Sequence, residues 1–148
     1  SNKYVEYQVD SVHYSRPGKF ADYKDNEVAG VPKAFYSAGL RFAPPLWRGA
    51  YVEIDVQGLG EYFVDDGNVT SVPAYNILNL TVGLEKPLRL GENFNVRGFI
   101  GVNNLMDKKY AASAFINPDI VGGVPLYLEP GLPRNVVIGI SFSGNKTP

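Results

Sequence analysis

Apolar and polar residues alternate along several short stretches of the chain. The clearest is residues 51–63 (YVEIDVQGLGEYF), in which Val52, Ile54 and Val56 take alternate positions and Glu53 and Asp55 lie between them. Successive side chains of a β-strand point to opposite sides, so this stretch would have one apolar and one acidic face. A soluble sandwich would bury the apolar face, whereas a transmembrane barrel would turn it to lipid and the acidic face to a wet lumen.

The same alternation predicts an all-β fold with an antiparallel meander. In the first predicted strand the apolar positions change parity near Asp10 and Ser11, which indicates a β-bulge. The chain holds 10 Tyr, 8 Phe, 16 Gly and 11 Pro, a composition typical of short strands joined by turns. Six strands are expected, at residues 4–14, 34–43, 51–63, 75–85, 93–103 and 135–142.

The connections between these strands alternate in length. Short connections at residues 44–49 and 86–92 follow the second and fourth strands, and longer ones follow the first, third and fifth. In a meander, alternate connections lie at opposite ends of the sheet. Outer-membrane barrels sort their loops in this way, with short periplasmic turns and longer extracellular loops.

The polar faces of the strands favour a large barrel. Inside a closed barrel of only six strands, side chains such as Glu53 and Arg97 would be buried without water, which is costly. An open sheet would instead leave two unpaired edges and an exposed apolar face. We therefore expect this chain to be part of a larger barrel, with Trp47, Phe42 and Tyr51 at the membrane boundary.

Composition excludes several other classes of protein. Lys and Arg total 14 against 15 Asp and Glu, and the basic residues are scattered, so no nucleic-acid footprint is visible. The absence of Cys excludes disulfides and thiolate zinc sites. No apolar run approaches the roughly 18 residues that a membrane-spanning helix needs. Ser1 and Asn2 are interpreted as an expression scar and left out of the domain assignment.

Four segments resemble TonB-dependent outer-membrane receptors. GVNNLMDKKYAASAF (101–115) is similar to the family's penultimate strand and its Asn-Leu-Phe-Asp motif, with Met106 in place of the usual Phe. YLEPGLPRNVVIGISF (127–142) resembles the closing strand, and VAGVPK (28–33) and YFVDDGNVTSVPAYNILN (62–79) resemble two earlier strands with their loops. The residues that carry the motif resemblance are Asn104, Leu105, Asp107, Tyr110, Pro130, Gly131, Pro133, Arg134 and Phe142.

This resemblance implies a fold, a location and a function. Residues 3–148 would be the C-terminal six strands of a barrel of about 22 strands in the bacterial outer membrane. The N-terminal plug and the motif that contacts the inner-membrane energy-transducing protein would be missing here. The long connections at 15–32, 64–73 and 104–133 would be extracellular. One departure is that residues 143–148 follow Phe142, whereas the family commonly ends on that aromatic residue.

The resemblance also implies energy-coupled uptake of a scarce nutrient such as a ferric siderophore, with no enzymatic activity, no cofactor and no resident metal. The partners would be a small metal chelate, outer-membrane lipid and the energy-transducing protein. The alternative to ligand contact is a structural role for these side chains, which is packing within a loop, an ion pair inside the lumen or a position in the aromatic girdle. The candidate ligand-binding residues are Tyr62, Phe63, Tyr110, Phe115, Tyr127 and Arg134.

Other candidate sites have plainer interpretations. The single histidine, His13, is interpreted as a surface or girdle residue rather than a metal ligand. The sequence Asp65-Asp66-Gly67-Asn68 lacks the spacing of an EF-hand and predicts a turn. The acidic residues at 22, 25 and 27 are interpreted as a solvated loop.

Two rival interpretations stay open at this point. A soluble β-sandwich binding module would pack its apolar faces into one dry core, and a small hydrolase is disfavoured by the single His and the lack of Cys. The discriminating side chains are Ile54, Val56, Leu78, Leu80, Ile138 and Ile140. An isolated open sheet would be expected either to pair edges with a second copy or to fold over its apolar face.

Overall fold

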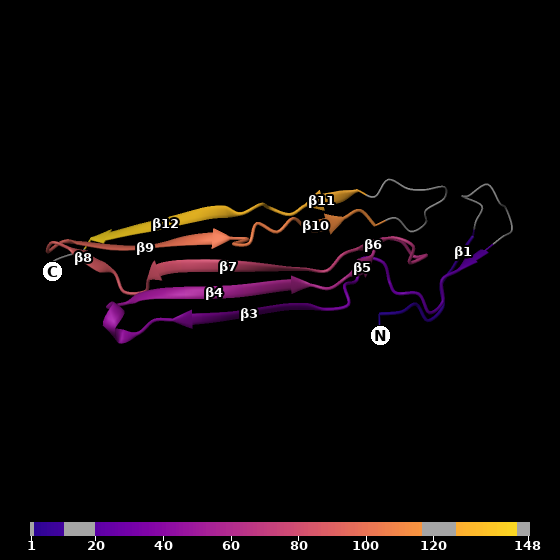
Figure 1. Cartoon of the computed structure of the whole chain (residues 1–148), viewed down its shortest axis with the longest axis horizontal. Coiled ribbons are helices and arrows are strands. Elements are labelled where there is room, and N and C mark those ends of the chain that lie inside the picture. The colour runs from indigo at the N-terminus through magenta and orange to yellow at the C-terminus, as the bar shows by residue number, and fades with distance from the viewer. Residues whose placement is uncertain (1, 11–19, 117–126, 145–148) are drawn as a thin grey trace. The chain divides into compact units, whose positions relative to one another are not determined.

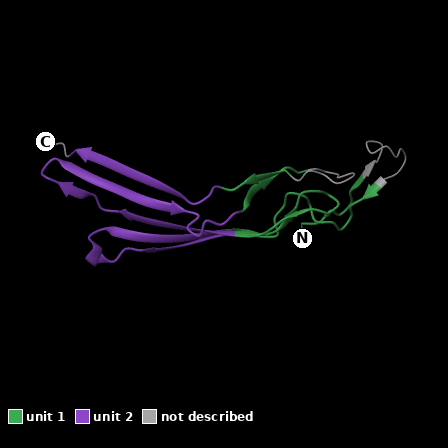
Figure 2. Cartoon of the chain, turned by 45° about the horizontal axis from the view of Figure 1, so that its top comes forward, with its two compact units in different colours: residues 1–35, 58–75, 110–131 green, residues 36–57, 76–109, 132–148 purple. Residues whose placement is uncertain are grey.

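The computed structural model describes residues 2–10, 20–116 and 127–144 of the chain. The chain divides into two compact units (Figure 2). Unit 1 comprises residues 1–35, 58–75 and 110–131, and unit 2 comprises residues 36–57, 76–109 and 132–148. The described residues form antiparallel strands and one short 3-10 helix, with no α-helix. Within the described ranges there is no helix that is both long and apolar enough to cross a membrane.

Unit 2 is built on a sheet that follows the order of the chain (Figure 1). Its strands run in the order β12-β9-β7-β4-β3, and the short strand β8 pairs with β9 off this path. Each long strand therefore lies beside its sequence neighbour, as in a meander. The bounds are β3 (Phe35–Phe42), β4 (Ala50–Leu59), β7 (Tyr75–Leu84), β8 (Leu88–Leu90), β9 (Phe94–Asn103) and β12 (Asn135–Gly144).

The register of the sheet separates apolar from polar side chains. β12 pairs with β9 without interruption from Asn135↔Asn103 to Gly144↔Phe94, and Leu80 of β7 pairs with Val102 of β9. Even-numbered residues therefore pair with even-numbered ones, and odd with odd. As a result the even face carries mainly Val, Ile, Leu and Phe, and the odd face carries the charged and amide side chains. The alternation predicted from the sequence is confirmed for these strands.

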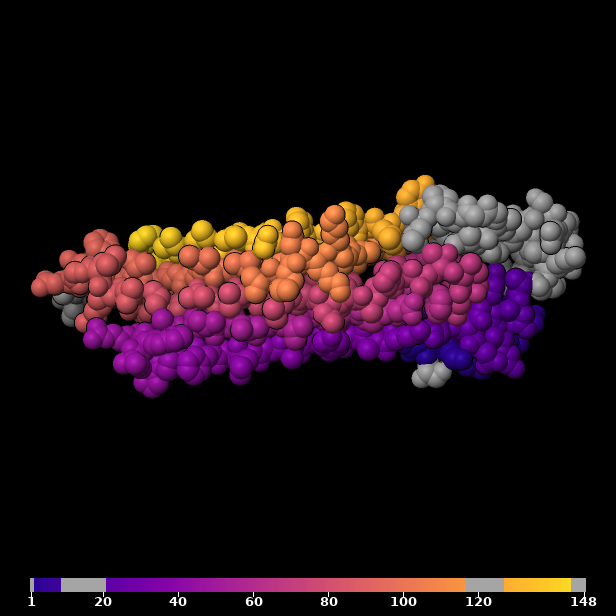
Figure 3. Space-filling view, in the orientation of Figure 1, coloured from indigo at the N-terminus to yellow at the C-terminus, as the bar shows by residue number. Residues whose placement is uncertain are grey.

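Within the described residues, the apolar face of this sheet is not packed against a second layer. Ile54 of β4 is 47% exposed and Ile138 of β12 is 64% exposed. In the space-filling view the strands run as parallel bands of side chains across the sheet (Figure 3). A soluble sandwich would bury these residues in one core, so the exposure contradicts that interpretation.

The connections at one end of the sheet are short. Between β3 and β4 lies the 3-10 helix η2 (Pro45–Trp47), and the chain then turns through Arg48 and Gly49, both with positive φ. The ring of Trp47 meets that of Phe42 edge to face, with 5.4 Å between centroids. Phe42 and Trp47 therefore lie together at this end of the sheet.

The described residues of unit 1 form three small antiparallel strand pairs, which we call hairpins. β1 (Gln8–Asp10) pairs with β2 (Phe20–Asp22), β5 (Tyr62–Phe63) with β6 (Ser71–Val72), and β10 (Ala111–Ala114) with β11 (Leu128–Pro130). The second hairpin carries a small core, in which Val64 and Val72 are each 1% exposed. Leu59, Ala111 and Ala114 pack around it.

Two predicted strands differ from the structure. The first is expected at residues 4–14, of which residues 11–14 lie outside the described ranges; among the described residues it corresponds to β1, which pairs with β2 rather than with the large sheet. Its expected bulge reaches Ser11, which lies outside the described residues. The third, expected at 51–63, is divided into β4, which ends at Leu59, and β5 at Tyr62–Phe63. A Cβ at Gly60 would lie 2.9 Å from the backbone nitrogen of Ala34, so the two backbones approach too closely for another residue.

The described part of the long connection at 104–134 also contains two strands that were not expected. It was predicted to be a loop, but β10 and β11 form a hairpin inside it. These strands have four and three residues, too short for an alternation pattern to be recognised. The predicted strands at 34–43, 75–85, 93–103 and 135–142 match β3, β7, β9 and β12 closely.

Candidate functional site

The polar face of unit 2 carries paired charges. Arg41 of β3 donates to Glu53 at 2.5 Å and to Glu85 at 2.9 Å. Nearby, Asn79 donates to Asp55 at 2.8 Å. The side chains of the ion pairs are between 31% and 47% exposed, so water still reaches them. These carboxylates therefore form the lining of a wetted wall, as predicted for a lumen face.

Aromatic rings on this face lie over glycines of the neighbouring strand. A Cβ at Gly83 would lie 2.7 Å from the hydroxyl of Tyr51, and one at Gly139 would lie 2.3 Å from the ring of Phe99. Because these glycines have no side chain, the two rings rest directly on the sheet. The guanidinium of Arg41 in turn lies 4.3 Å from the centroid of the Tyr51 ring.

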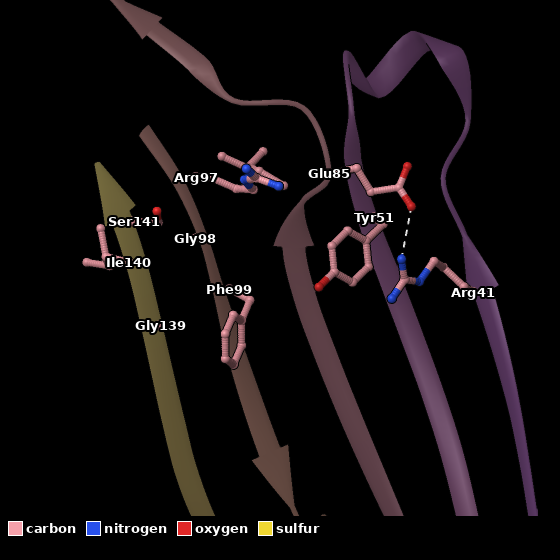
Figure 4. A pocket seen from close by; sticks show the side chains of 10 residues that line it. Arg41, Tyr51, Glu85, Arg97, Gly98, Phe99, Gly139, Ile140 and Ser141 are labelled. Atoms are coloured by element: carbon pink, nitrogen blue, oxygen red, sulfur yellow. Dashed lines mark hydrogen bonds and ion pairs between the residues drawn. The ribbon is translucent and has the colours of Figure 1, made fainter. Parts of the chain in front are cut away.

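A hollow of about 530 Å³ opens between these side chains. Figure 4 shows the residues that line it and the contact between Arg41 and Glu85. The aromatic rings of Tyr51 and Phe99 contribute to the lining, and so does Arg97 of β9. The hollow therefore combines cationic, anionic and aromatic groups on one face of the sheet.

The motif after β9 forms a compact hydrogen-bonded turn. Asn104 is 2% exposed and has a positive φ of 52°. Its amide donates to the carbonyls of Lys108 at 2.9 Å and Leu132 at 3.1 Å, and its carbonyl oxygen accepts from the Lys108 N–H. Asn79 accepts from the Asn104 N–H at 2.9 Å. Asn104 thereby ties the end of β9 to the chain that leads into β12.

Other motif residues complete this turn. The N–H of Leu105 donates to the carbonyl of Leu78 on β7 at 2.7 Å. The carboxylate of Asp107 accepts from the N–H of Arg134 at 2.9 Å. The guanidinium of Arg134 donates to the carbonyl of Leu105 at 3.5 Å rather than to a carboxylate. The structure thus brings Asn104, Leu105, Asp107 and Arg134 together.

Tyr110 lies in unit 1 together with two further motif residues. Its ring covers Gly131, where a Cβ would lie 2.1 Å from the ring, and its centroid is 4.4 Å from that of Tyr75. The carbonyl of Tyr110 accepts from the Gly131 N–H at 2.8 Å. Pro130 ends β11 next to this contact. Pro133 accepts from the Asn135 side chain in unit 2, and Phe142 lies on the apolar face of β12, 71% exposed.

The candidate ligand contacts fall into two groups. Phe115 and Tyr127 continue the β10–β11 hairpin, with the Phe115 N–H donating to the Tyr127 carbonyl at 3.0 Å, and they are 70% and 64% exposed. Tyr62, in contrast, is 6% exposed in the core of unit 1. Phe63 lies beneath the ammonium of Lys33, 5.6 Å from the ring centroid.

Sequence reasoning missed a tyrosine cluster in unit 1. The rings of Tyr4 and Tyr7 stack at 4.7 Å, and Tyr23 follows at 5.9 Å. The Tyr4 hydroxyl donates to the buried carboxylate of Asp66 at 2.5 Å. Burial and this acceptor together raise the pKa of Tyr4 to about 12. The only signal in the sequence was the repeated tyrosine near the N-terminus, which we interpreted as strand alternation.

The predicted turn at residues 65–68 is confirmed. Asn68 has a positive φ of 54°, and its N–H donates to the Asp65 carbonyl at 3.1 Å. The Asp65 carboxylate accepts from the N–H groups of Val69 and Thr70, so it caps the turn. No group of three metal-ligating side chains occurs among residues 2–10, 20–116 and 127–144. The interpretation of His13 lies outside the described residues.

Comparison with protein families agrees with this geometry. The family model described as TonB dependent receptor-like, beta-barrel matches residues 2–105 of the chain. The match covers β3, β4, β7 and β9 of the sheet and the first two hairpins of unit 1. The chain therefore belongs to the TonB-dependent receptor family, a family of transporters and receptors whose β-barrels lie in the bacterial outer membrane.

Proposed function

We propose that residues 3–148 form the C-terminal portion of a receptor barrel that takes up a ferric siderophore with energy from an inner-membrane partner. In this proposal the barrel wall is scaffold and conduit, the loops capture the ligand, and no covalent chemistry takes place. The observation that carries the proposal is the sheet of unit 2, which exposes an apolar face and, opposite it, a face of paired charges. Lipid fits the first face and a wet lumen fits the second.

The β10–β11 hairpin is the strongest candidate for ligand capture. Phe115 follows β10 and Tyr127 precedes β11, a backbone hydrogen bond joins the two residues, and both side chains are mostly exposed. Two exposed aromatic rings offer a large contact area at little entropic cost. Arg134, an exposed residue of unit 2, is a separate candidate contact for an anionic chelate. Tyr62 and Tyr110 pack inside unit 1, so we assign them a structural role in supporting this hairpin rather than a contact with the ligand.

A test measures uptake of radioiron by cells that depend on this receptor. Iron is supplied separately as catecholate, hydroxamate and citrate chelates. We expect one chelate class to be taken up, with loss of uptake when the proton-motive force is collapsed. The double change Phe115→Ser and Tyr127→Ser should lower uptake at least fivefold, because each aromatic contact contributes about 1 kcal/mol or more.

The matched control is Leu128→Ser, an exposed apolar residue of the same hairpin, which is 42% exposed. This variant should bind and import like the parent protein. Equal loss of uptake in the control and the double variant would show that general disruption of the hairpin, and not the aromatic pair, is responsible. Energy-independent uptake of all three chelates would refute the receptor proposal.

A second part of the proposal concerns the isolated chain. β3 and β12 are the outer strands of the sheet in the described residues, so each offers one unpaired edge. We propose that, without detergent or lipid, these edges pair with a second copy. Sedimentation at increasing protein concentration should show dimers and larger species. A stable monomer across that range, with the sheet intact, would refute this part.

A further inference from the structure

The polar face of unit 2 carries two similar arrangements, of which only one is complete. In the complete one, the Tyr51 ring rests on Gly83 and the Arg41 guanidinium lies over the ring. Two carboxylates, from Glu53 and Glu85, then neutralise the guanidinium. Every charged group in this arrangement has a partner within the sheet.

The second arrangement repeats the ring and the arginine but lacks the anion. Phe99 rests on Gly139, its direct partner across the β9–β12 ladder, and is 41% exposed. Arg97 is two residues away on the same face, directly opposite Ser141. Among the described residues, the Arg97 side chain has neither an ion pair nor a hydrogen bond.

Both arrangements open into the same hollow of about 530 Å³ (Figure 4). This volume lies within the range of sites that hold small molecules. Along its lining, the Arg97 guanidinium, the Phe99 ring and the Ser141 hydroxyl come from adjacent strands, β9 and β12. They offer a cation, a flat apolar surface and a hydrogen-bond donor within one short stretch of wall.

We propose that Arg97, Phe99 and Ser141 bind a small molecule that carries a carboxylate beside a flat apolar group. The Arg97 guanidinium donates two parallel hydrogen bonds to the carboxylate, since its planar fork matches the two oxygens. Ser141 donates a further hydrogen bond, and the apolar part lies on Phe99. The carboxylate takes the place that Glu53 and Glu85 occupy beside Arg41.

This site is separate from the proposed capture surface and does not depend on which nutrient is imported. Its occupant is defined by chemistry alone: one negative charge and one flat group. The test therefore uses purified protein and a simple probe, so its result is independent of uptake by cells. Failure of the uptake proposal would leave this inference standing, and failure here would leave the uptake proposal standing.

The experiment measures binding of para-fluorobenzoate to the protein in an uncharged detergent, by fluorine NMR. The neutral control ligand is para-fluorobenzamide, which has the same ring but no charge. We expect the benzoate to bind and the benzamide to bind at least tenfold more weakly. Arg97→Gln should weaken benzoate binding about tenfold or more, because hydrogen bonds between charged groups are roughly twice as strong as those between neutral groups.

Two further variants separate local contact from general effects. Ser141→Ala should weaken benzoate binding a few-fold, as expected for loss of one hydrogen bond. Lys86→Gln removes a positive charge from the turn after β7, at a residue that follows Glu85 but does not itself line the hollow, and should leave binding unchanged. Heat-modifiable migration on a gel confirms that each variant is folded.

Three results would overturn the inference. The first is equal binding of benzoate and benzamide, which would show an adventitious apolar contact. The second is equal weakening by Arg97→Gln and Lys86→Gln, which would show attraction to net charge only. The third is benzoate binding that Arg97→Gln leaves unchanged in a folded protein, which would place the carboxylate elsewhere.

Discussion

The two units of this chain are stabilised in different ways. In unit 1, Val64 and Val72 are each 1% exposed and the carboxylates of Asp65 and Asp66 are buried and hydrogen-bonded. In unit 2, long strands leave side chains such as Ile138 mostly exposed on a single-layered sheet. Unit 1 thus carries a small core of its own. In the proposed barrel, unit 2 depends on what surrounds it, with lipid on its even face and water on its odd face.

The comparison teaches that alternation has different meanings in the two units. Along β4, β9 and β12, alternation places apolar side chains on one face of the sheet and polar side chains on the other. The apolar side chains are exposed within this chain, as expected for a face that lipid would cover. In β5 and β6 the same kind of residues point into protein. Burial within the chain therefore cannot be inferred from alternation alone. The length of the strand and the presence of a second layer decide it.

The largest expected effect comes from a charge on the apolar face of unit 2. Ile138→Lys, near the middle of β12, should destabilise the protein in lipid by about 2–4 kcal/mol, because the ammonium would lie in hydrocarbon. The matched control is Val137→Lys, the next residue along the strand, which is on the polar face and 44% exposed. The measurement is urea unfolding in lipid vesicles, followed by the fluorescence of Trp47.

If both lysine variants lose the same stability, the assignment of the two faces is wrong. If neither does, the sheet of unit 2 does not face lipid at all. The tryptophan signal belongs to the short turn after β3 in unit 2, so it reports the unit that carries the substitution.

A smaller effect is expected from a cavity in unit 1. Val64→Ala removes two methyl groups from a fully buried site and should destabilise this unit by about 2 kcal/mol. Val69→Ala makes the same chemical change at a residue that is 80% exposed in the same hairpin, and should cost little. Hydrogen exchange of the β5–β6 amides measures the difference. Equal exchange in the two variants would contradict a packed core in unit 1.

The smallest expected effect concerns the tyrosine cluster. The pKa of Tyr4 is raised from 10.0 to about 12, which means that folding favours the neutral phenol. The stability from this group is therefore complete below pH 10 and is lost as pH rises from 10 through about 12. Tyr4→Phe, which lacks the titrating hydroxyl, should flatten this pH dependence and cost about 1 kcal/mol at neutral pH. Near-ultraviolet circular dichroism across this pH range measures it.

The control for the tyrosine prediction is Tyr127→Phe. Tyr127 is 64% exposed, and its side chain lies outside the cluster. Its variant should keep the pH dependence of the parent protein. A parent protein that unfolds no differently from Tyr4→Phe above pH 10 would contradict the buried contact with Asp66.

The long strands could be predicted from the sequence because odd-numbered and even-numbered positions along each strand face different environments. Residues 75–85 and 93–103 needed only the alternation of apolar and polar positions to be recognised as β7 and β9. The prediction placed Glu53 and Asp55 on one wetted face, and the structure pairs them with Arg41 and Asn79. Such contacts link neighbouring strands, so they follow once the order of strands is known.

The rest could not be predicted, because it depends on contacts between distant segments of the chain. Tyr4 meets Asp66 across 62 positions, and Asn104 meets Leu132 across 28. No local pattern in the sequence predicts such long-range contacts. The hairpins of unit 1 have two to four residues per strand, and side-chain hydrogen bonds to the backbone hold their turns. Of the candidate ligand contacts, Tyr62 looked equivalent to Phe115 in sequence, yet only Phe115 is exposed.

The hydrogen bonds of Asn104 have a further consequence for the segment that follows it. They join the end of β9 to Leu132 and so hold together the two ends of the inserted segment that carries β10 and β11. The entropic cost of closing a loop rises only slowly with its length. With its base fixed by one buried side chain, the insertion can be lengthened, shortened or exchanged while the β9–β12 ladder keeps its register. One asparagine would thus let binding specificity evolve separately from the wall of the barrel.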